Sequence, residues 1–495
     1  MNAFSRRGAC PALSAPMQTG DGLLVRLNPV AGGLAPKSLI GLGESALRHG
    51  NGIMEVTARG SLQIRGLTAE SARLLADEVD ALGIEVRTGV PVETGPLAGI
   101  DPEENADPRP LAERISAAIE AAGLTTRVGP KVSVVVDGGG QLTMNALTAD
   151  VRLKAMRAGE DVRWGVSVAD DGRSARWLAT VDADAARDIA VAALRMVAER
   201  GREAHTRDLS ERQLASLAGW HSFAPPSVLP DISPTRGEIE PSPPVSPIIK
   251  VEPSSKVAGR APSAELPISP LVGEMSGRTE GGAVERPRLP IGFFKMNVGQ
   301  TLGIALPYGS MPAQSLIDLA TQAANLGASE IRLAPGRALL FLGLSVPSSL
   351  QSSAAALGFV TDPADPRTRI AACPGTPACA SGRIATRAIA ETIAKESADL
   401  LDTSLTLHIS GCAKGCAHPG TAALTLVGGE NGAGLVVDGT AKALPAAYRP
   451  GYDAARGVAG ILAAIRDGRH QGETAAACLA RLGAAGIAEL YRRNQ

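Results

Sequence analysis

The sequence is poor in aromatic residues, in long apolar runs and in net charge. Aromatic residues make up only 3% of the 495 residues, so the hydrophobic cores must be built from aliphatic side chains. No run of about 18 apolar residues occurs, so we expect no membrane-spanning helix. The 49 lysines and arginines nearly balance the 50 aspartates and glutamates, and a net charge of −1 gives no overall field that would attract nucleic acid or a membrane surface. Any anionic ligand must therefore be bound by local arginines and lysines.

Cysteine is also scarce, which argues against a secreted disulfide-rich protein. Six cysteines are too few for a fold held by disulfides, and the N-terminal segment lacks the apolar stretch of an export signal. We therefore predict a cytoplasmic protein, in which grouped thiols are typical of a metal site. Cys10 and Cys478 stand apart from the other four cysteines and are interpreted as ordinary thiols.

The remaining four cysteines form two pairs with the spacings C-x5-C and C-x3-C. They are Cys373, Cys379, Cys412 and Cys416. Zinc sites commonly use C-x2-C pairs, because two intervening residues make the tight turn around a tetrahedral ion. The wider spacing favours a [4Fe–4S] cluster over structural zinc or unligated thiols. Glycine, alanine, proline and serine flank each cysteine, which we interpret as room for a bulky group.

The surroundings of the two pairs predict loops at the ends of regular elements. The first pair precedes a predicted helix, 381–396, and the second follows a predicted buried strand, 405–409. Backbone N–H groups in such loops can donate hydrogen bonds to thiolates and cluster sulfides and so tune the reduction potential.

A segment rich in proline, serine, glycine and glutamate divides the chain. Residues 222–290 show neither helical nor strand periodicity, so we predict a mobile linker without regular structure. The sequences on its two sides resemble each other, because residues 38–67 align with residues 315–344 without gaps and with nine identities in 30 positions. Each copy is predicted to begin with a strand, 23–27 or 302–306, followed by a helix and two further strands.

A second pair of similar segments follows these copies. Residues 132–139 line up with residues 405–412, and an Asp-Ala-Ala-Arg sequence opens a predicted closing helix at Asp184 and again at Asp453. We therefore predict an α+β protein with an internal pseudo-twofold, in the order A–B–linker–A′–B′. The predicted boundaries of these five parts are 12–90, 91–221, 222–290, 291–362 and 363–495. Only B′ has the cysteines, since B has the thiol-free sequence VPVETGPLAGI where B′ has ACPGTPACASG.

The cysteine spacing on this repeated frame resembles the sulfite/nitrite reductase superfamily. The resemblance implies ferredoxin-like half-domains for A and A′. In that superfamily the last cysteine of C-x3-C, here Cys416, bridges the cluster to the iron of sirohaem, which makes Cys416 a predicted catalytic residue. Three further sequences resemble the precorrin-3B synthases of aerobic cobalamin biosynthesis, a family within this superfamily: RRGACPALSAPMQTGDGLLVRLNP, TGPLAGIDPEENADPRPLAERI and SGCAKGCAHP.

The second resemblance implies an O2-dependent mono-oxygenase that acts on precorrin-3A. C20 is hydroxylated, a ring-A acetate closes into a γ-lactone, and the other oxygen atom leaves as water, with NADH as the ultimate electron donor. The sequence G-x-G-x-x-A at Gly41 lies inside a predicted helix with no strand before it, so it is not a dinucleotide-binding motif and a separate reductase or ferredoxin is expected. The alternatives are a sirohaem- and [4Fe–4S]-dependent assimilatory sulfite or nitrite reductase, or a tetrapyrrole-binding protein without catalysis.

A precorrin has several acetate and propionate groups, and arginine binds carboxylates bidentately. The tetrapyrrole-binding signature of the superfamily, Thr-x-Arg followed by Gln, matches Thr57, Arg59 and Gln63 on the first predicted hairpin. Arg65 follows at even spacing from Arg59 and is predicted to point to the same sheet face. Two further candidate anchors are Arg26 and Arg87.

Two lysines are also predicted to act at the site. Lys131 matches a basic segment that enters the strand of unit B in the superfamily, and it is predicted to be catalytic. Sulfite reductases have a second lysine two residues later, where this chain has Ser133, which weakens the sulfite reductase alternative. Lys414 lies within the second cysteine pair and is predicted either to neutralise cluster charge or to meet a substrate carboxylate.

Oxygen chemistry needs a reduced metal with an open position, which a cluster with four cysteine ligands lacks. The resemblance implies a mononuclear non-haem iron, but its usual triad of two histidines and one carboxylate is not evident in the sequence. His418, two residues after Cys416, is the best positional candidate for a ligand. His408 lies within a predicted apolar strand and is interpreted as a core residue.

Overall fold

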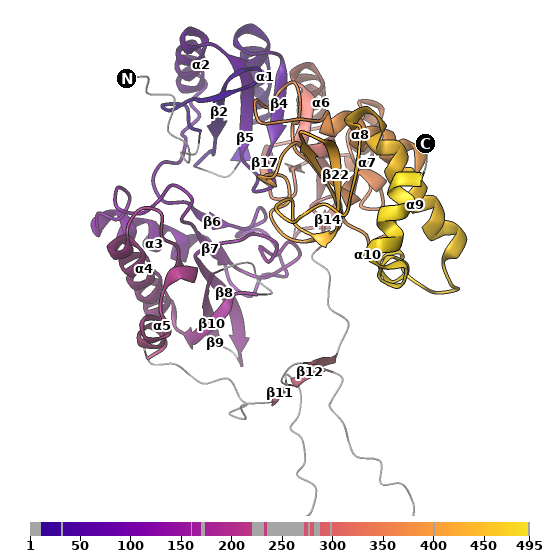
Figure 1. Cartoon of the computed structure of the whole chain (residues 1–495). Helices are drawn as coiled ribbons and strands as arrows, with labels where there is room; N and C mark the ends of the chain where they lie inside the picture. The colour runs from indigo at the N-terminus through magenta and orange to yellow at the C-terminus, as the bar shows by residue number, and fades with distance from the viewer. Residues whose placement is uncertain are drawn as a thin grey trace, which may run out of the picture.

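The structure, a computed structural model, describes most of the chain on both sides of the predicted linker (Figure 1). The described residues are 11–30, 33–159, 161–169, 174–219, 288–297, 299–398 and 401–493, with three short strands between 232 and 281. Cys10 lies outside them. In this part of the chain no helix is long and apolar enough to cross a membrane. The described residues form four five-stranded sheets with helices packed on them, which confirms the predicted α+β class.

Unit A is an antiparallel sheet covered by two helices. Its strand order is β1-β2-β5-β4-β16. The strands are β1 (Met17–Thr19), β2 (Gly22–Leu27), β4 (Ile53–Val56), β5 (Leu62–Leu67) and β16 (Ser310–Pro312), and the helices are α1 (Pro36–His49) and α2 (Ala69–Ala81). Helix α1 buries Leu39, Leu42 and Ala46, at the spacing of three and four residues that gives a helix one apolar face.

Unit A′ repeats this plan, and the two units exchange edge strands. Its antiparallel strand order is β14-β15-β18-β17-β3. The strands are β14 (Gly292–Lys295), β15 (Gln300–Ala305), β17 (Glu330–Ala334), β18 (Ala338–Leu342) and β3 (Gly33–Leu34), and the helices are α6 (Ala313–Asn325) and α7 (Pro347–Ala356). Strand β3 belongs to the first repeat and β16 to the second, so each sheet is completed by a strand of the other repeat.

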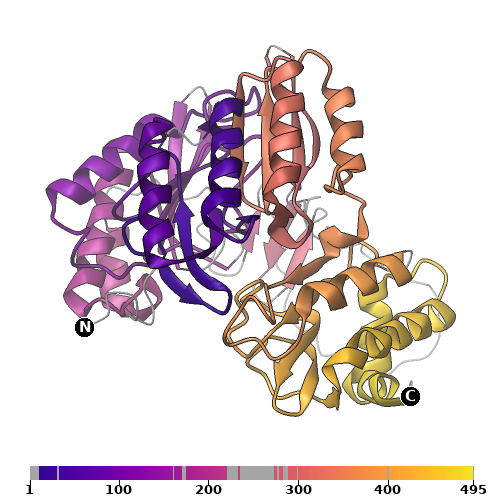
Figure 2. The same cartoon turned by 90° about the horizontal axis from the view of Figure 1, so that it is seen from above.

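The helices of A and A′ lie side by side in one layer (Figure 2). Close approach of α1 and α6 depends on Gly43, where a Cβ would lie 2.5 Å from Cγ1 of Ile317. Apolar residues of both units form one continuous core. The predicted duplication of strand, helix and strand pair is confirmed, and its two copies share their core.

Units B and B′ have the same sheet topology as each other. Their strand orders are β10-β9-β8-β7-β6 and β23-β22-β21-β20-β19, and in each sheet the last three strands are parallel while the others are antiparallel. The strands of B are β6 (Val92–Thr94), β7 (Val134–Asp137), β8 (Val151–Ala158), β9 (Asp161–Val168) and β10 (Arg176–Val181). Those of B′ are β19 (Ile370–Ala372), β20 (Leu407–Ser410), β21 (Ala422–Gly429), β22 (Gly432–Gly439) and β23 (Ala447–Arg449).

Helices cover the sheets of B and B′, which are the two outer units of the fold. They are α3 (Arg109–Ala121), α4 (Ala183–Arg200) and α5 (Glu211–Ala218) in B, and α8 (Thr386–Glu396), α9 (Ala454–Gly468) and α10 (Ala475–Arg493) in B′. The predicted closing helices at the two Asp-Ala-Ala-Arg sequences are confirmed as α4 and α9. Helix α8 begins at Thr386 rather than at the predicted residue 381, because the preceding backbone bonds to the cysteine loops: the N–H of Arg383 donates to Gly411 (2.8 Å) and the carbonyl oxygen of Ile384 accepts from Thr376 (3.0 Å).

Three short strands lie within residues 222–290, where the sequence predicts no regular structure. They are β11 (Ile232–Pro234), β12 (Val272–Met275) and β13 (Arg278–Gly281), in one antiparallel sheet. The prediction is therefore wrong at these residues, and the rest of the predicted linker up to residue 287 lies outside the described residues.

Candidate metal centre

The four cysteines lie at one edge of the sheet of unit B′. Strands β19 and β20 are parallel neighbours, so their carboxyl ends meet at the same edge. Cys373 directly follows β19, and Cys412 is the second residue after β20. The loops that continue from these strands contain Cys379 and Cys416. Parallel pairing of two strands therefore brings together thiol pairs that are far apart in the sequence.

The other three thiols lie within electrostatic range of the Cys416 thiol. Burial raises the pKa of the Cys416 thiol, and the thiols of Cys373, Cys412 and Cys379 raise it further, because each disfavours another negative charge nearby. Lys414 has the opposite effect on the Cys416 thiol. Four thiolates in one site repel one another and are stabilised by the positive charge of a bound metal group.

Four thiols are the donor set of a [4Fe–4S] cluster. Within the ranges that the structure describes, no three His, Cys, Asp or Glu side chains converge closely enough to hold one metal ion. In a [4Fe–4S] cluster each thiolate binds a different iron, so the four sulfurs do not converge on one point. The backbone N–H of Gly411 donates to Sγ of Cys373 at 3.1 Å, a hydrogen bond of the kind that tunes cluster potentials. The donor set therefore fits the predicted cluster.

Glycines bring the two cysteine loops into backbone contact. Gly375 has a φ of +63°, and a Cβ at this position would lie 2.5 Å from Oγ1 of Thr386. A Cβ on Gly411 would lie 3.2 Å from the Cα atoms of both Gly375 and Gly382. The prediction that these small residues leave room for a bulky group is wrong for these glycines, because neighbouring backbone fills the space. Their function is close packing of one loop on the other.

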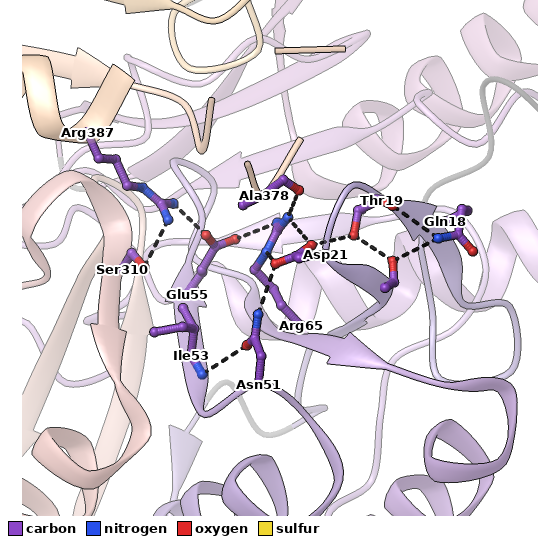
Figure 3. Close-up of polar contacts among 11 residues, drawn as sticks. Gln18, Thr19, Asp21, Asn51, Ile53, Glu55, Arg65, Ser310, Ala378 and Arg387 are labelled. Atoms are coloured by element: carbon purple, nitrogen blue, oxygen red, sulfur yellow. Dashed lines mark hydrogen bonds and ion pairs between the residues drawn. The ribbon is translucent and has the colours of Figure 1, made fainter. Parts of the chain in front are cut away.

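Arg65 lies in a buried network of charged groups between unit A and the first cysteine loop (Figure 3). Its Nε and Nη2 donate to Asp21 at 3.0 and 2.9 Å, and its Nη1 donates to Glu55 at 3.3 Å. Nη2 also donates to the carbonyl oxygen of Ala378 at 2.6 Å. Only 4% of the side chain is exposed. Because its donors are used within the protein, the structure argues against the predicted contact of Arg65 with substrate.

Arg59 lies in the turn between β4 and β5, so the predicted shared sheet face with Arg65 is wrong. Its guanidinium forms an ion pair with Glu93 and donates to the carbonyl oxygen of Thr148 at 2.7 Å and to Oγ of Ser133 at 3.3 Å. A third of the side chain, 34%, remains exposed. Arg59 therefore joins unit A to unit B and still presents part of its guanidinium side chain to solvent.

Other residues of the predicted signature shape the hairpin that presents Arg59. Oγ1 of Thr57 accepts from the backbone N–H of Ser61 at 3.0 Å and closes the turn. Gln63 is buried in β5, where the register places it between Arg26 of β2 and Glu55 of β4. Arg26 is half-buried. The structure thus places Arg26 and Gln63 side by side in the sheet, and Thr57 in the turn that contains Arg59.

Three further predicted residues are exposed. Arg87 donates to the carbonyl oxygen of Val92 at 3.3 Å. Lys131 lies three residues before β7, at the predicted entry to the strand of unit B. Nζ of Lys414 donates to Oγ of Ser381 at 2.9 Å and so links the two cysteine loops.

Arg337 contacts the second cysteine loop but was not predicted from the sequence. It lies in the turn between β17 and β18 with a φ of +66°, and its Nη2 donates to the carbonyl oxygen of Ala417 at 3.0 Å, next to Cys416. The internal repeat contains a signal for it, because Arg337 aligns with Gly60, the residue after Arg59. Equivalent turns of A and A′ thus each direct one arginine to the outer unit that follows in the chain.

His408 is a fully buried residue of β20, as predicted. Neither ring nitrogen has a hydrogen-bond partner among the described residues, and the ring meets that of His418 edge-on with centroids 5.7 Å apart. Burial lowers the pKa of His408 to about 4, and the charges of His418 and Arg337 contribute, so the imidazole is neutral at pH 7. Nε2 of His418 is paired with the carbonyl oxygen of Thr421 at 3.0 Å.

These two histidines do not fit a mononuclear iron site. No carboxylate joins them in a group of three within the part of the chain that the structure describes. The nearby guanidinium of Arg337 already disfavours a positive charge on His408, and it disfavours a metal cation in the same way. The structure therefore gives no support to His418 as a ligand of a mononuclear iron within the described residues.

In unit B, polar side chains join the two loops that correspond to the cysteine loops. The equivalent strand pairs place Gly95 where Cys373 stands in B′. Asp101 lies six residues beyond Gly95, as Cys379 lies six residues beyond Cys373. The Asp101 carboxylate accepts from the backbone N–H and from Nε2 of Gln141 at 2.7 and 3.0 Å. Hydrogen bonds thus close unit B where unit B′ has thiols.

Comparison with known proteins agrees with the architecture. Residues 15–82 match the family described as nitrite/sulfite reductase ferredoxin-like half domain. The solved structure of the NirA protein of Mycobacterium tuberculosis is similar to this chain, with a TM-score of 0.66, and the similarity covers 94% of this chain and 84% of NirA. The sequence identity is 17%, so this similarity shows the fold alone.

A sequence relative extends the comparison to almost every residue. A precorrin-3B synthase from a Sinorhizobium species is 36% identical over 494 residues, which cover 99% of this chain and 96% of the relative. The predicted resemblances at both levels, the superfamily fold and the narrower family, are thus confirmed by independent comparisons.

Proposed function

This chain belongs to the precorrin-3B synthase family, and from that premise we propose that it oxidises precorrin-3A with O2. The enzyme is an oxidoreductase of the mono-oxygenase type. One oxygen atom enters the substrate as the C20 hydroxyl while a ring-A acetate closes into a γ-lactone. The other atom leaves as water, which takes up two electrons and two protons. The product is therefore heavier than the substrate by one oxygen atom.

The convergence of two thiol pairs at the ends of β19 and β20 carries the proposal. We assign a [4Fe–4S] cluster to the four thiols, and when bound it supplies electrons one at a time. Gly411 offers a backbone N–H to one of these sulfurs, and Lys414 places a positive charge beside the second pair. Cys416 is the most exposed residue of the four cysteines, which favours it as the ligand nearest to the substrate.

We assign the substrate carboxylates to cations that lie on the side of unit A and unit B. Arg59 is partly exposed and donates to Ser133, two residues after the exposed Lys131, so both cations belong to one neighbourhood. Arg59 binds a carboxylate and Lys131 stabilises negative charge that develops on the substrate. Thr57 and Gln63 support the hairpin that presents Arg59. Further anchors proposed for the remaining carboxylates are Arg26, Arg87 and Lys414.

Electrons come from a partner protein in this proposal. Gly41 and Gly43 of the G-x-G-x-x-A sequence lie inside α1, so this sequence is not the strand-turn-helix motif that binds a dinucleotide. NADH is then the ultimate donor, and a separate reductase or ferredoxin delivers its electrons to the cluster.

The test uses the anaerobically purified protein. Iron and sulfide analysis with optical and EPR spectra should give about four irons per chain and no sirohaem absorption. Incubation with precorrin-3A, O2 and a reductant should then give a product heavier by one oxygen atom. Bound sirohaem with reduction of sulfite or nitrite would overturn the proposal in favour of the reductase alternative. Tight binding of precorrin-3A without turnover would overturn the catalytic assignment.

A further inference from the structure

Units A and A′, which share one core, are the two central units of the fold. One arginine of each unit donates hydrogen bonds to a loop in the opposite half of the chain. Arg65 of unit A donates to the carbonyl oxygen of Ala378 in the first cysteine loop of B′, at 2.6 Å. Arg332 of unit A′ donates to the carbonyl oxygens of Pro96 and Ala98 in the corresponding loop of B, at 3.3 and 3.5 Å. The loops of B and B′ at equivalent positions therefore each accept hydrogen bonds from an arginine of the other half of the chain. Only the loop of B′ contains thiols.

The contact made by Arg65 is the shorter of the two, and two carboxylates bind all three nitrogens of its guanidinium (Figure 3). Asp21 binds Nε and Nη2, and Glu55 binds Nη1. The Glu55 carboxylate also pairs with Arg387, whose Nη1 donates to Oγ of Ser310 at 3.1 Å. Arg387 is the second residue of α8, so Glu55 is linked to the first cysteine loop through Arg65 and to the helix after that loop through Arg387.

Burial does not prevent these groups from being charged. Burial opposes the ionised form of Asp21, but hydrogen bonds from Arg65 and Thr19 outweigh it and hold the pKa of Asp21 below its usual value. Burial likewise opposes the charge of Arg65, and its bonds to Asp21 and Glu55 keep the pKa of its guanidinium raised. Removal of Arg65 would leave two buried carboxylates with one fewer cation between them.

Gly20 makes an uncharged contact with the same peptide group. Its backbone N–H donates to the carbonyl oxygen of Ala378 at 3.2 Å. A Cβ at Gly20 would lie 2.5 Å from the carbonyl oxygen of Pro377 and 2.9 Å from the carbonyl carbon of Cys379. These are backbone atoms of the loop itself, so a side chain at residue 20 would push the hairpin of unit A away from the loop.

We propose that Arg65 is a positioning residue for the cluster ligand Cys379. Arg65 and Gly20 fix the carbonyl oxygen of Ala378, and this oxygen belongs to the peptide group whose nitrogen is that of Cys379. The Cys379 N–H donates to the carbonyl oxygen of Gly375 at 2.7 Å, so this peptide group is held at both ends. The guanidinium also polarises the peptide next to the thiolate, which stabilises the reduced, more negative cluster. The inference rests on the proposed cluster. It assigns part of the environment of the cluster to unit A, which contains none of the four thiols.

The test compares Arg65→Met with Arg332→Met, its counterpart at the loop without thiols. Both variants lose an arginine contact between a central unit and an outer unit. We expect release of iron to a chelator to be roughly 10- to 100-fold faster in Arg65→Met, with a more negative cluster midpoint potential and altered EPR g-values. Arg65→Lys keeps the charge without the planar fork and should fall between Arg65→Met and the unmodified protein. Arg332→Met should leave the iron release, potential and EPR spectrum unchanged.

Two further measurements keep the inference open to refutation. If Arg65→Met does not fold, Gly20→Ala disturbs the same peptide group without removing a charge and should accelerate iron release in the same direction. After removal of the cluster, alkylation of Cys379 followed by mass spectrometry should be faster in Arg65→Met than in Arg332→Met. Equal iron release and equal alkylation in these two variants would overturn the inference. Absence of a cluster from the unmodified protein would overturn the proposed function instead, while the alkylation comparison would still test Arg65.

Discussion

Arg65 and Ala378 are 313 positions apart in the sequence and are joined by a hydrogen bond of 2.6 Å from the arginine Nη2 to the carbonyl oxygen. The thiols of the candidate metal centre all belong to unit B′, but the loop of Cys379 is held from unit A. The site is therefore a property of the duplicated chain as a whole. The position of its first loop depends on the packing of the N-terminal hairpin, which is formed by β1 and β2.

The first prediction concerns Cys416. Replacement by serine, Cys416→Ser, should remove turnover of precorrin-3A and lower the bound iron, because a hydroxyl is a much poorer ligand for iron than a thiolate. The measurements are iron content, EPR and product mass. Cys478→Ala is the control, since Cys478 is a buried thiol of α10 outside the candidate site. Full activity in Cys416→Ser would contradict a catalytic role for the cluster.

The second prediction compares backbone strain at a glycine of the first cysteine loop with backbone strain at a glycine outside the candidate site. Gly375→Ala places a Cβ 2.5 Å from Oγ1 of Thr386 at a φ of +63°, so we expect a loss of more than about 2 kcal/mol of unfolding free energy together with loss of iron. Gly83→Ala is the matched control, because Gly83 has a φ of +66° and a Cβ added there would meet nothing within 4 Å. It should cost about 1 kcal/mol and leave the iron in place. Denaturant unfolding and iron analysis of both variants make the comparison.

The sequence predicted which cysteines would lie near one another better than it predicted the residues around them. The two cysteine pairs each follow a strand, and parallel neighbours bring such segments to one sheet edge, so local spacing was enough. Arg65 was assigned to the substrate because its spacing from Arg59 suggested a shared face. That spacing does not reveal that Arg59 lies in a turn, nor that Asp21 and Ala378 surround Arg65. Contacts between distant segments depend on the packing of units, which a periodicity argument does not contain.

The exchange of edge strands between A and A′ was missed for a similar reason. Strand β3 has two residues and β16 has three, and segments this short carry no periodic pattern. Helix α8 was predicted to begin too early, because the prediction did not take account of Gly382, a poor helix former, or of the hydrogen bonds from residues 381–385 to the cysteine loops. The duplication itself was visible in the sequence, but Arg337 was not predicted from it, because the aligned residue of the first copy is Gly60.

The third prediction is a pH dependence of stability caused by Glu104. Burial raises the pKa of Glu104 to about 7, and the nearby carboxylates of Asp101, Asp107 and Asp137 contribute to the rise. The folded protein therefore binds this proton more tightly than the unfolded chain does. Stability due to Glu104 is fully present below the unfolded pKa of 4.5 and is lost as the pH rises through about 7.

Glu104→Gln removes this titration and resembles the protonated form. At pH 8 the variant should be more stable than the unmodified protein, by on the order of 1–3 kcal/mol, and near pH 4.5 the two should be similar. Glu103→Gln, at the exposed neighbouring residue, should have little effect at either pH. Thermal unfolding from pH 4.5 to pH 8 measures the difference, and an equal pH profile in Glu104→Gln and the unmodified protein would contradict the assignment.

The fourth prediction tests Arg59 as a substrate contact against its structural role beside Glu93. Arg59→Ala should raise the KM for precorrin-3A by roughly tenfold or more and should also lower stability, because Glu93 is only 17% exposed and loses its cation. Glu93→Gln removes the same ion pair but keeps the guanidinium. It should lower stability without raising KM. An unchanged KM in Arg59→Ala would show that Arg59 only joins unit A to unit B.

The last prediction concerns His408, whose two ring nitrogens are buried without hydrogen-bond partners among the described residues. An unsatisfied buried polar group costs about 1–3 kcal/mol. In the equivalent register of unit B the residue is Val135, which is also fully buried. His408→Val should therefore raise the unfolding free energy, by about 1 kcal/mol or more, because valine is nearly as large and has no polar atoms.

The reciprocal variant, Val135→His, supplies the control for His408→Val. It introduces a buried imidazole into unit B and should lower the unfolding free energy by a similar or larger amount. Iron content should be unchanged in both variants, since neither residue belongs to the four thiols. A lower stability of His408→Val would contradict the account of His408 as an unsatisfied core residue. It would mean that the imidazole nitrogens have a stabilising hydrogen-bond partner.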